Sequence, residues 1–408
     1  MHEIIELKNG LRVVIENIPY VKSISVGVWV GAGSYAETRA NSGISHFIEH
    51  MMFKGTKKRT PKEIAESIDD IGGQLNAFTS RDCTCYYAKV LSDHLDTAID
   101  VLSDMLFNSL FDVNDISLEQ GVVLEEINMY NDSPDELVHD LLMEKVWQGN
   151  SLGYSILGTS KSLKKITRED ILSYIENHYT PQNSIISVVG NFDRDNLLSL
   201  INNAFGGWKS NGVVKKSPNT PRFTAGKYEI SKDIEQTHLC VGYDALSRGH
   251  QLLYPLMVVN TVLGSGMSSR LFQKIREEKG LVYSIYSYQS VFAKAGLFTI
   301  YAGMNPARLD EVSSLIFKEI EHLKNNGLSE SEVAKSKEQL KGGLILGLES
   351  TSSRMNSYGQ SLLLIDKIRT IDEMIEKIDS VNVSNVKQVI DLVFTQPATA
   401  IVQKTPIV

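Results

Sequence analysis

Apolar residues recur along the chain with two periods, one typical of strands and one typical of helices. In the first half, near-alternation predicts strands at residues 3–7, 11–15, 23–30, 74–90 and 184–189. Helical spacing, with Pro at the start and Gly-Gly at the end of one segment, predicts helices at residues 42–53, 61–71, 93–106 and 113–129. Strands and helices therefore share one domain.

The second half repeats this order. Strands are predicted at residues 228–230, 238–243 and 297–302, and helices at 251–263, 309–325 and 329–348. Between the halves, residues 208–227 are polar, contain Pro218 and Pro221, and show no period, which indicates a linker. We therefore expect a duplicated α+β unit, with an N-terminal domain at 1–210, a linker at 211–226 and a C-terminal domain at 227–408.

Composition narrows the class of protein. The chain has 408 residues, of which 42% are hydrophobic and 22% charged, and this excludes collagen-like, largely disordered and disulfide-scaffold proteins. The net charge of −8 argues against a nucleic-acid partner. No apolar run reaches about 18 residues, and the acidic N-terminus resembles no signal peptide, so we expect a cytoplasmic protein without a membrane partner. Of three cysteines, Cys83 and Cys85 are predicted to be small core residues in a reducing compartment.

One motif carries most of the chemistry. His46-Phe-Ile-Glu-His50 lies within a helix-periodic segment, so both imidazoles share one helix face and can converge on a single Zn²⁺. Glu49 lies beside His50 and can reach a water on the metal without binding the metal itself. This is the inverted order of the commoner His-Glu-x-x-His zinc helix. The alternative is that both histidines are ordinary core residues that bind no metal.

Two histidines leave a catalytic zinc one protein ligand short, and the third should be a carboxylate or another histidine. The remaining histidines form no second cluster in the sequence. The acidic helix at 116–129 is a better source, because Glu119 and Glu126 are seven residues apart and share one face, whereas Glu125 points about 100° away. By itself this would be an ordinary charged amphipathic helix.

At this point the sequence resembles a known family. The segment from Gly43 to Thr56, Gly-Ile-Ser-His-Phe-Ile-Glu-His-Met-Met-Phe-Lys-Gly-Thr, is similar to the signature of the pitrilysin/insulysin family of zinc peptidases, in its mitochondrial processing peptidase β-like branch with short bacterial members. The resemblance implies that Glu126 is the third zinc ligand and that Glu119 supports the site as an accessory acid. It also implies two homologous domains, each a mostly antiparallel sheet covered by helices.

Further matches extend over most of the chain. The segment Gly72–Thr79 resembles the family's substrate-holding edge strand, with Asn76 and Ala77 at the substrate-contacting positions. In the second half, Arg276 and Tyr283 fit an Arg and a Tyr, seven residues apart, that reach across to the zinc site in the family. The second half has no inverted motif, so the first half is expected to supply the metal ligands and the second half only walls and substrate contacts.

The expected function is a zinc-dependent endopeptidase acting on unfolded or short peptides. Zn²⁺, one per chain, activates a water, Glu49 acts as general base, and Tyr283, aided by Arg276, stabilises the oxyanion. The resemblance implies pairing of two such chains into a closed chamber, so a homodimer is expected. Two alternatives stay open: a non-catalytic structural subunit of the same fold, and a zinc hydrolase of a non-peptide substrate.

Overall fold

The computed structural model describes residues 2–210 and 219–405. The chain folds into two compact units, and each is made of three stretches of chain. Unit 1 comprises Met1–Ile127, Tyr154–Pro218 and Gly347–Ile368, and unit 2 comprises Asn128–Gly153, Asn219–Leu346 and Arg369–Val408. The part of the expected linker at 211–218 lies outside the described residues.

Unit 1 is built on a six-stranded sheet with the order β1-β2-β6-β3-β5-β4. Its strands are β1 (Glu3–Glu6), β2 (Arg12–Asn17), β3 (Ser23–Val30), β4 (Gln74–Thr79), β5 (Thr84–Leu91) and β6 (Ser184–Gly190). Only β2 and β6 pair in parallel, and the other neighbours are antiparallel. Strand β4 ends the order, so it is an edge strand, as the family resemblance implied.

Helices cover both faces of this sheet. The first half of the chain supplies α1 (Ile44–Met51), α2 (Pro61–Asp69), α3 (Leu95–Asn108), α4 (Val113–Asn131), α6 (Ser160–Leu163), α7 (Arg168–His178) and α8 (Arg194–Phe205). The apolar residues of α1–α4, α7 and α8 form one core with the sheet. The opposite face carries α12 (Thr351–Ile365), whose Met355 and Leu362 pack against Trp29 in a second apolar cluster.

Unit 2 repeats the five-strand order that follows β1 in the sheet of unit 1. Its order is β7-β11-β8-β10-β9, formed by β7 (Gly226–Lys232), β8 (Thr237–Ala245), β9 (Val282–Val291), β10 (Gly296–Met304) and β11 (Pro397–Lys404). Its one parallel pair, β7 with β11, corresponds to β2 with β6 in unit 1, and the remaining pairs are antiparallel. The expected duplicated α+β fold with two mostly antiparallel sheets is therefore confirmed.

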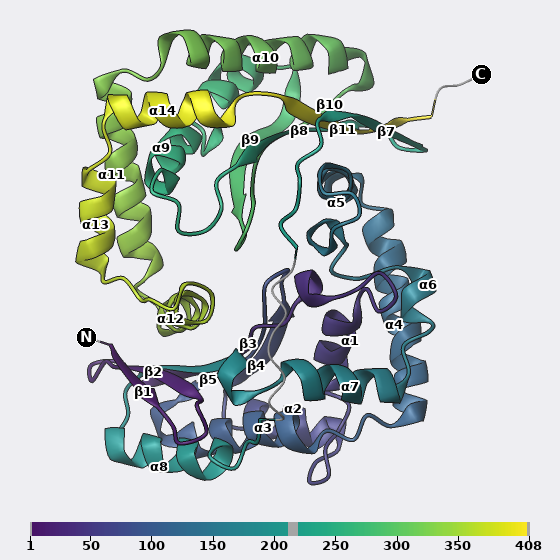
Figure 1. Cartoon of the computed structure of the whole chain (residues 1–408), viewed down its shortest axis with the longest axis vertical. Helices are drawn as coiled ribbons and strands as arrows, with labels where there is room; N and C mark the ends of the chain where they lie inside the picture. The colour runs from purple at the N-terminus through teal and green to yellow at the C-terminus, as the bar shows by residue number, and fades with distance from the viewer. Residues whose placement is uncertain (1, 211–218, 406–408) are drawn as a thin grey trace. The chain divides into compact units, whose positions relative to one another are not determined.

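The helices of unit 2 are arranged on two sides of its sheet. They are α5 (Pro134–Val146), α9 (Leu253–Gly264), α10 (Leu309–Asn326), α11 (Glu330–Gly347), α13 (Ile371–Asp379) and α14 (Val383–Val393). Figure 1 shows α10 and α14 on one side of this sheet and α5 on the other, where α5 contacts β8 and β11. On the α5 side, His139 lies against Tyr288 and Cys240.

The division into contiguous halves at 1–210 and 227–408 differs from this arrangement. Helix α5, from the first half, packs on the sheet of unit 2, and α12, from the second half, packs on the sheet of unit 1. Each sheet has a second face that its own half leaves uncovered, and packing on that face accounts for the exchange. Helix α12 buries apolar side chains there, and α5 places His139 against Cys240 and Tyr288. Chain order alone does not encode such a partner.

The single strand expected at 74–90 is wrong. The segment is a hairpin of β4 and β5, because Ser80 donates from both its N–H and its Oγ to the carbonyl oxygen of Cys83 at 2.8 and 2.9 Å. The turn places Cys83 and Cys85 in the same apolar cluster, where both are fully buried. Their prediction as core residues is confirmed.

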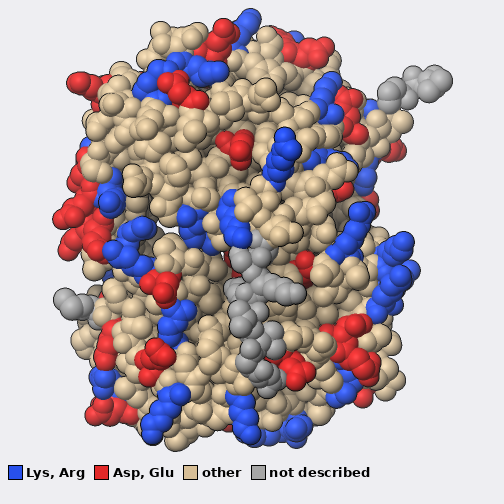
Figure 2. All heavy atoms as spheres, viewed as in Figure 1, with Lys and Arg blue, Asp and Glu red and all other residues tan. Residues whose placement is uncertain are grey.

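The surface carries mixed charge. On the face seen in Figure 2, Lys and Arg are interspersed with Asp and Glu over most of the area, in line with the small net charge. Among the described residues, no helix combines the length and apolar character that crossing a membrane requires.

Candidate metal centre

The inverted motif lies on α1, whose sequence separates an apolar face from a polar one. Ile44, Phe47, Ile48 and Met51, at positions i, i+3, i+4 and i+7, are at most 1% exposed. This face anchors the helix in the core of unit 1. The histidines and Glu49 therefore project from the other side of a rigidly held helix.

The start of α1 is fixed by two features outside the motif. Gly43 has a left-handed φ of 92°, and a Cβ there would lie 2.6 Å from the carbonyl oxygen of Leu157, so only glycine fits. The buried carboxylate of Glu37 accepts hydrogen bonds from the N–H groups of Gly43 at 2.7 Å and Ser45 at 2.9 Å. Glu37 thus performs the capping that Gly43, without a side chain, cannot.

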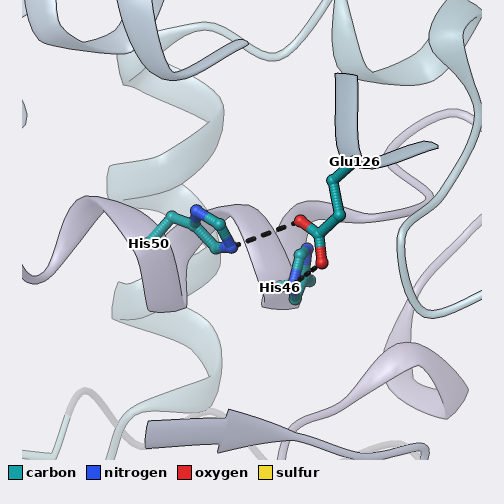
Figure 3. A group of neighbouring side chains, drawn as sticks. All are labelled: His46, His50 and Glu126. Carbon is teal, nitrogen blue, oxygen red and sulfur yellow. Dashed lines mark ion pairs between the residues drawn. The ribbon is translucent and has the colours of Figure 1, made fainter. Parts of the chain in front are cut away.

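Three side chains of unit 1 converge next to this helix. Figure 3 shows the carboxylate of Glu126, from α4, facing both imidazoles of α1. Glu126 Oε1 lies 3.8 Å from His46 Nε2, and Glu126 Oε2 lies 3.6 Å from His50 Nε2. Ligand atoms of the three residues all lie within 4.8 Å of one another, and within the described part of the chain they are the one such group of His, Cys, Asp or Glu side chains.

This donor set fits a catalytic zinc ion. Two imidazoles and one carboxylate match a three-ligand site with an open position, and bonds of 2.0–2.2 Å place tetrahedral ligands roughly 3.3 Å apart. The separations of Glu126 from the two imidazoles, 3.6 and 3.8 Å, need to contract only by a few tenths of an ångström. Burial lowers the pKa of His46 to about 4, which keeps its imidazole neutral and able to bind a cation. His46 Nδ1 is buried without a hydrogen-bond partner among the described residues.

Glu119 lies behind His50, two turns before Glu126 on α4. Its Oε1 is 2.8 Å from His50 Nδ1, and its Oε2 is 2.6 Å from Lys54 Nζ. The carboxylate accepts a hydrogen bond from Nδ1–H, so His50 Nε2 carries the lone pair and faces Glu126. Glu125, by contrast, is exposed, as the helix spacing predicted.

Glu49 occupies a partly buried position beside the cluster. Thr79 Oγ1, at the end of β4, donates a hydrogen bond of 2.6 Å to Glu49 Oε2. Burial raises the pKa of Glu49, while the bond from Thr79 and the neighbouring His50 act in the opposite direction. The structure therefore holds a carboxylate with raised proton affinity next to the three candidate ligands.

The other expected site residues fall in two places. Asn76 and Ala77 lie on edge strand β4 of unit 1, where the Ala77 N–H donates to Asn76 Oδ1 at 2.8 Å. Arg276 and Tyr283 belong to unit 2. The Arg276 guanidinium lies 4.7 Å from the ring centre of Phe272, in the π-helical segment Phe272–Glu277, and Tyr283 is 76% exposed on β9. Their catalytic role stays a prediction.

Sequence reasoning missed three residues that contact this site. Lys54 lies four residues after His50, about one helical turn along the chain, and both contact Glu119. This spacing could have indicated that Lys54 reaches the same carboxylate as His50. Thr79 and Glu37 reach the motif only through the fold, from a strand and from a loop, and no local pattern marks them.

Comparison with known proteins gives consistent family matches. The family model described as insulinase (peptidase family M16) matches residues 12–160, and the model described as peptidase M16 inactive domain matches residues 165–340. The chain is 46% identical over 389 residues to a protein of Bacillus subtilis named "uncharacterized zinc protease YmxG", and the match covers 95% of each chain.

Solved structures share the fold over the whole chain. A protease from Helicobacter pylori is similar with a TM-score of 0.94 and 25% identity, and all of both chains is covered. The structure of a peptidase M16 inactive domain from Pseudomonas fluorescens is similar with a TM-score of 0.93 and 17% identity, covering 100% of this chain and 98% of that one. At 17% identity the likeness concerns the fold alone.

Proposed function

The chain belongs to peptidase family M16, the insulinase family that its sequence resembles. On this premise we propose that it is a zinc-dependent endopeptidase that cleaves unfolded or short peptides. The observation that carries this proposal is the convergence of His46, His50 and Glu126 with Glu49 beside them. The name "zinc protease" of the Bacillus subtilis relative supports zinc as the metal.

The three converging residues would hold one zinc ion per chain. Bound there, zinc lowers the pKa of a water molecule and polarises the carbonyl of the bond to be cleaved. His50 is oriented for this task by Glu119, which in turn is paired with Lys54. Such support of a ligand by a hydrogen-bonded carboxylate raises its basicity and fixes its direction.

Glu49 is assigned as the general base. It takes a proton from the attacking water and passes it to the departing amine. The hydrogen bond from Thr79 leaves one carboxylate oxygen, Oε1, for this transfer. Burial raises the pKa of Glu49 above that of an ordinary glutamate, which brings it closer to the value a general base needs.

Peptide substrate would bind by extending the sheet of unit 1. As the edge strand, β4 can pair with an extended chain through main-chain hydrogen bonds, largely independently of sequence. A substrate carbonyl would replace Asn76 Oδ1 as the acceptor of the Ala77 N–H. Folded proteins seldom offer a free extended segment, which is the reason for proposing unfolded or short peptides.

Unit 2 would supply the oxyanion donor. We assign this role to the hydroxyl of Tyr283, aided by Arg276; loss of such a donor typically costs on the order of 10²–10³ in rate.

Two chains would pair into a closed chamber. Sedimentation velocity of the purified protein tests this directly, because a single monomeric species would exclude the homodimer.

The central experiment combines metal analysis with a quenched fluorogenic peptide. The wild-type chain should bind about one zinc and cleave the peptide. Glu49→Gln should retain zinc but lose turnover, and Glu125→Gln, which changes an exposed acid on α4, should behave as the wild type. If Glu49→Gln cleaves at near the wild-type rate, Glu49 is not the base. Zinc binding without any peptide cleavage would instead favour the non-catalytic subunit or the non-peptide hydrolase.

A further inference from the structure

A cavity separate from the metal centre lies within unit 2, between α9, α11 and α13. Its volume is about 560 Å³, within the range of small-molecule binding sites. Most of its lining is apolar, with side chains contributed by all three helices: Leu253, Met257, Leu340, Leu344, Met374 and Ile378. The lining therefore favours the hydrocarbon part of a ligand.

One charged side chain completes this lining. Arg369, two residues before the start of α13, is the one charged residue that lines the cavity, and no carboxylate lines it. It is partly buried, and no ion pair or hydrogen bond joins its guanidinium to another of the residues at 2–210 and 219–405. A guanidinium carries five N–H donors that match a carboxylate, so an unpaired one beside apolar surface provides a strong reason for an anion to bind.

We propose that this cavity binds a small amphipathic monoanion, a carboxylate carried on a hydrocarbon chain. The carboxylate pairs with Arg369, and the hydrocarbon chain lies among the apolar side chains of α9, α11 and α13. Both parts are required, because the lining offers one cation and otherwise mainly apolar surface. This site is independent of the peptidase activity proposed above and of its metal.

Two adjacent glycines of α11 allow a matched test of the location. Gly343 lines the cavity, and a Cβ added there meets no atom within 4 Å. Gly342 also has no atom within 4 Å of such a Cβ, but it does not line the cavity. Either position is helical, so replacing glycine by leucine improves helix propensity and both variants should fold.

Methyl resonances give a readout at the site. Met257 and Met374 both line the cavity, while the other eight methionines among residues 2–210 and 219–405 do not. Decanoate, titrated below the concentration at which it forms micelles into the protein labelled at the methionine methyl groups, should shift the Met257 and Met374 signals saturably. The Met51 and Met52 signals, next to the metal centre, should stay in place.

The variants then identify the contacts. Arg369→Gln should weaken decanoate binding roughly tenfold, as loss of one charge-assisted hydrogen-bonded pair does. Decanol, which has the same chain without the charge, should bind at least that much more weakly than decanoate. Gly343→Leu should weaken binding, and Gly342→Leu should not.

Four results would overturn the assignment: no shift at Met257 and Met374, equal binding of decanol and decanoate, binding unaffected by Arg369→Gln, or equal effects of the two glycine substitutions. If the two methionine signals change with protein concentration rather than with decanoate, a second copy of the chain covers this face and the assignment is wrong. None of these measurements depends on peptide hydrolysis, so they also separate this site from the proposed peptidase activity.

Discussion

Glu119 Oε1 lies 2.8 Å from His50 Nδ1, so a buried carboxylate on α4 holds the imidazole of a candidate zinc ligand on α1. The same carboxylate contacts Lys54 Nζ at 2.6 Å. Because Glu119 is only 4% exposed, its charge is compensated by Lys54 rather than by water. The orientation of His50 therefore depends on two residues that do not touch the metal position.

Removing Glu119 should weaken metal binding. Glu119→Ala takes away the acceptor for His50 Nδ1–H, and loss of such a partner typically costs 10–100-fold in metal affinity. Glu119→Gln, whose amide oxygen can still accept this bond, should lose less. Competition with a chromogenic zinc chelator measures both, with Glu125→Ala as the exposed control on the same helix. Equal affinities of Glu119→Ala and the wild type would contradict the role of Glu119.

Glu126 and Glu49 should respond differently to the same substitution. Glu126→Gln removes a carboxylate that faces both His46 and His50, so zinc content should fall well below one per chain. Glu49→Gln should keep its zinc. Elemental analysis of the purified variants by mass spectrometry distinguishes the two. Full zinc occupancy in Glu126→Gln would place the third ligand elsewhere.

Thr79 should affect turnover without affecting the metal. Its hydroxyl donates at 2.6 Å to Glu49 Oε2, and Thr79→Val removes this bond while keeping the shape of the side chain. The base then loses its fixed orientation, and kcat on a fluorogenic peptide should fall roughly tenfold, as expected for a misplaced catalytic group. Thr79→Ser, which retains the hydroxyl, should restore most of the rate. A Thr79→Val enzyme with unchanged kcat would show that the bond is not used.

Glu37 should make the stability of the chain depend on pH. Burial raises the pKa of Glu37 to about 7 from an ordinary value of 4.5. Between pH 4.5 and pH 7 the folded chain therefore binds a proton on Glu37 that the unfolded chain has released. The contribution of this group to stability is fully present below pH 4.5 and is lost as the pH rises through 7. Between pH 5 and pH 8 the loss should amount to about 2–3 kcal/mol.

Glu37→Gln cannot titrate, so the free energy of unfolding of this variant should lack that part of the pH dependence. Urea denaturation of both proteins at pH 5 and pH 8 gives the comparison. Parallel changes in the two proteins would show that Glu37 does not titrate with a raised pKa.

Much of the candidate site could be predicted because its spacing is local. Residues three, four and seven apart on a helix share a face in any context, so the convergence of His46 with His50, and of Glu119 with Glu126, needed only the helical periods of α1 and α4. The repeated order of strands and helices likewise indicated two similar sheets. The late strand β11, which pairs in parallel with β7, was not predicted, because its place in the sheet depends on a partner about 170 residues away.

Local periodicity along this chain is thus enough to establish the helix that carries the motif and the face that Glu119 and Glu126 share, because these depend on neighbours within two helical turns. The repeated order of elements indicated the duplicated fold, and only the family resemblance implied that the acidic face meets the motif. Long-range packing decided the rest. Packing on the second face of each sheet brought α12 to the first sheet and α5 to the other, and the turn at Ser80–Cys83 divided one apparent strand into two. The packing of α1 against β4 brought Thr79 to Glu49. Such contacts join residues far apart in the chain, and the choice among partners is made by the burial of surface and the satisfaction of hydrogen bonds in the assembled fold.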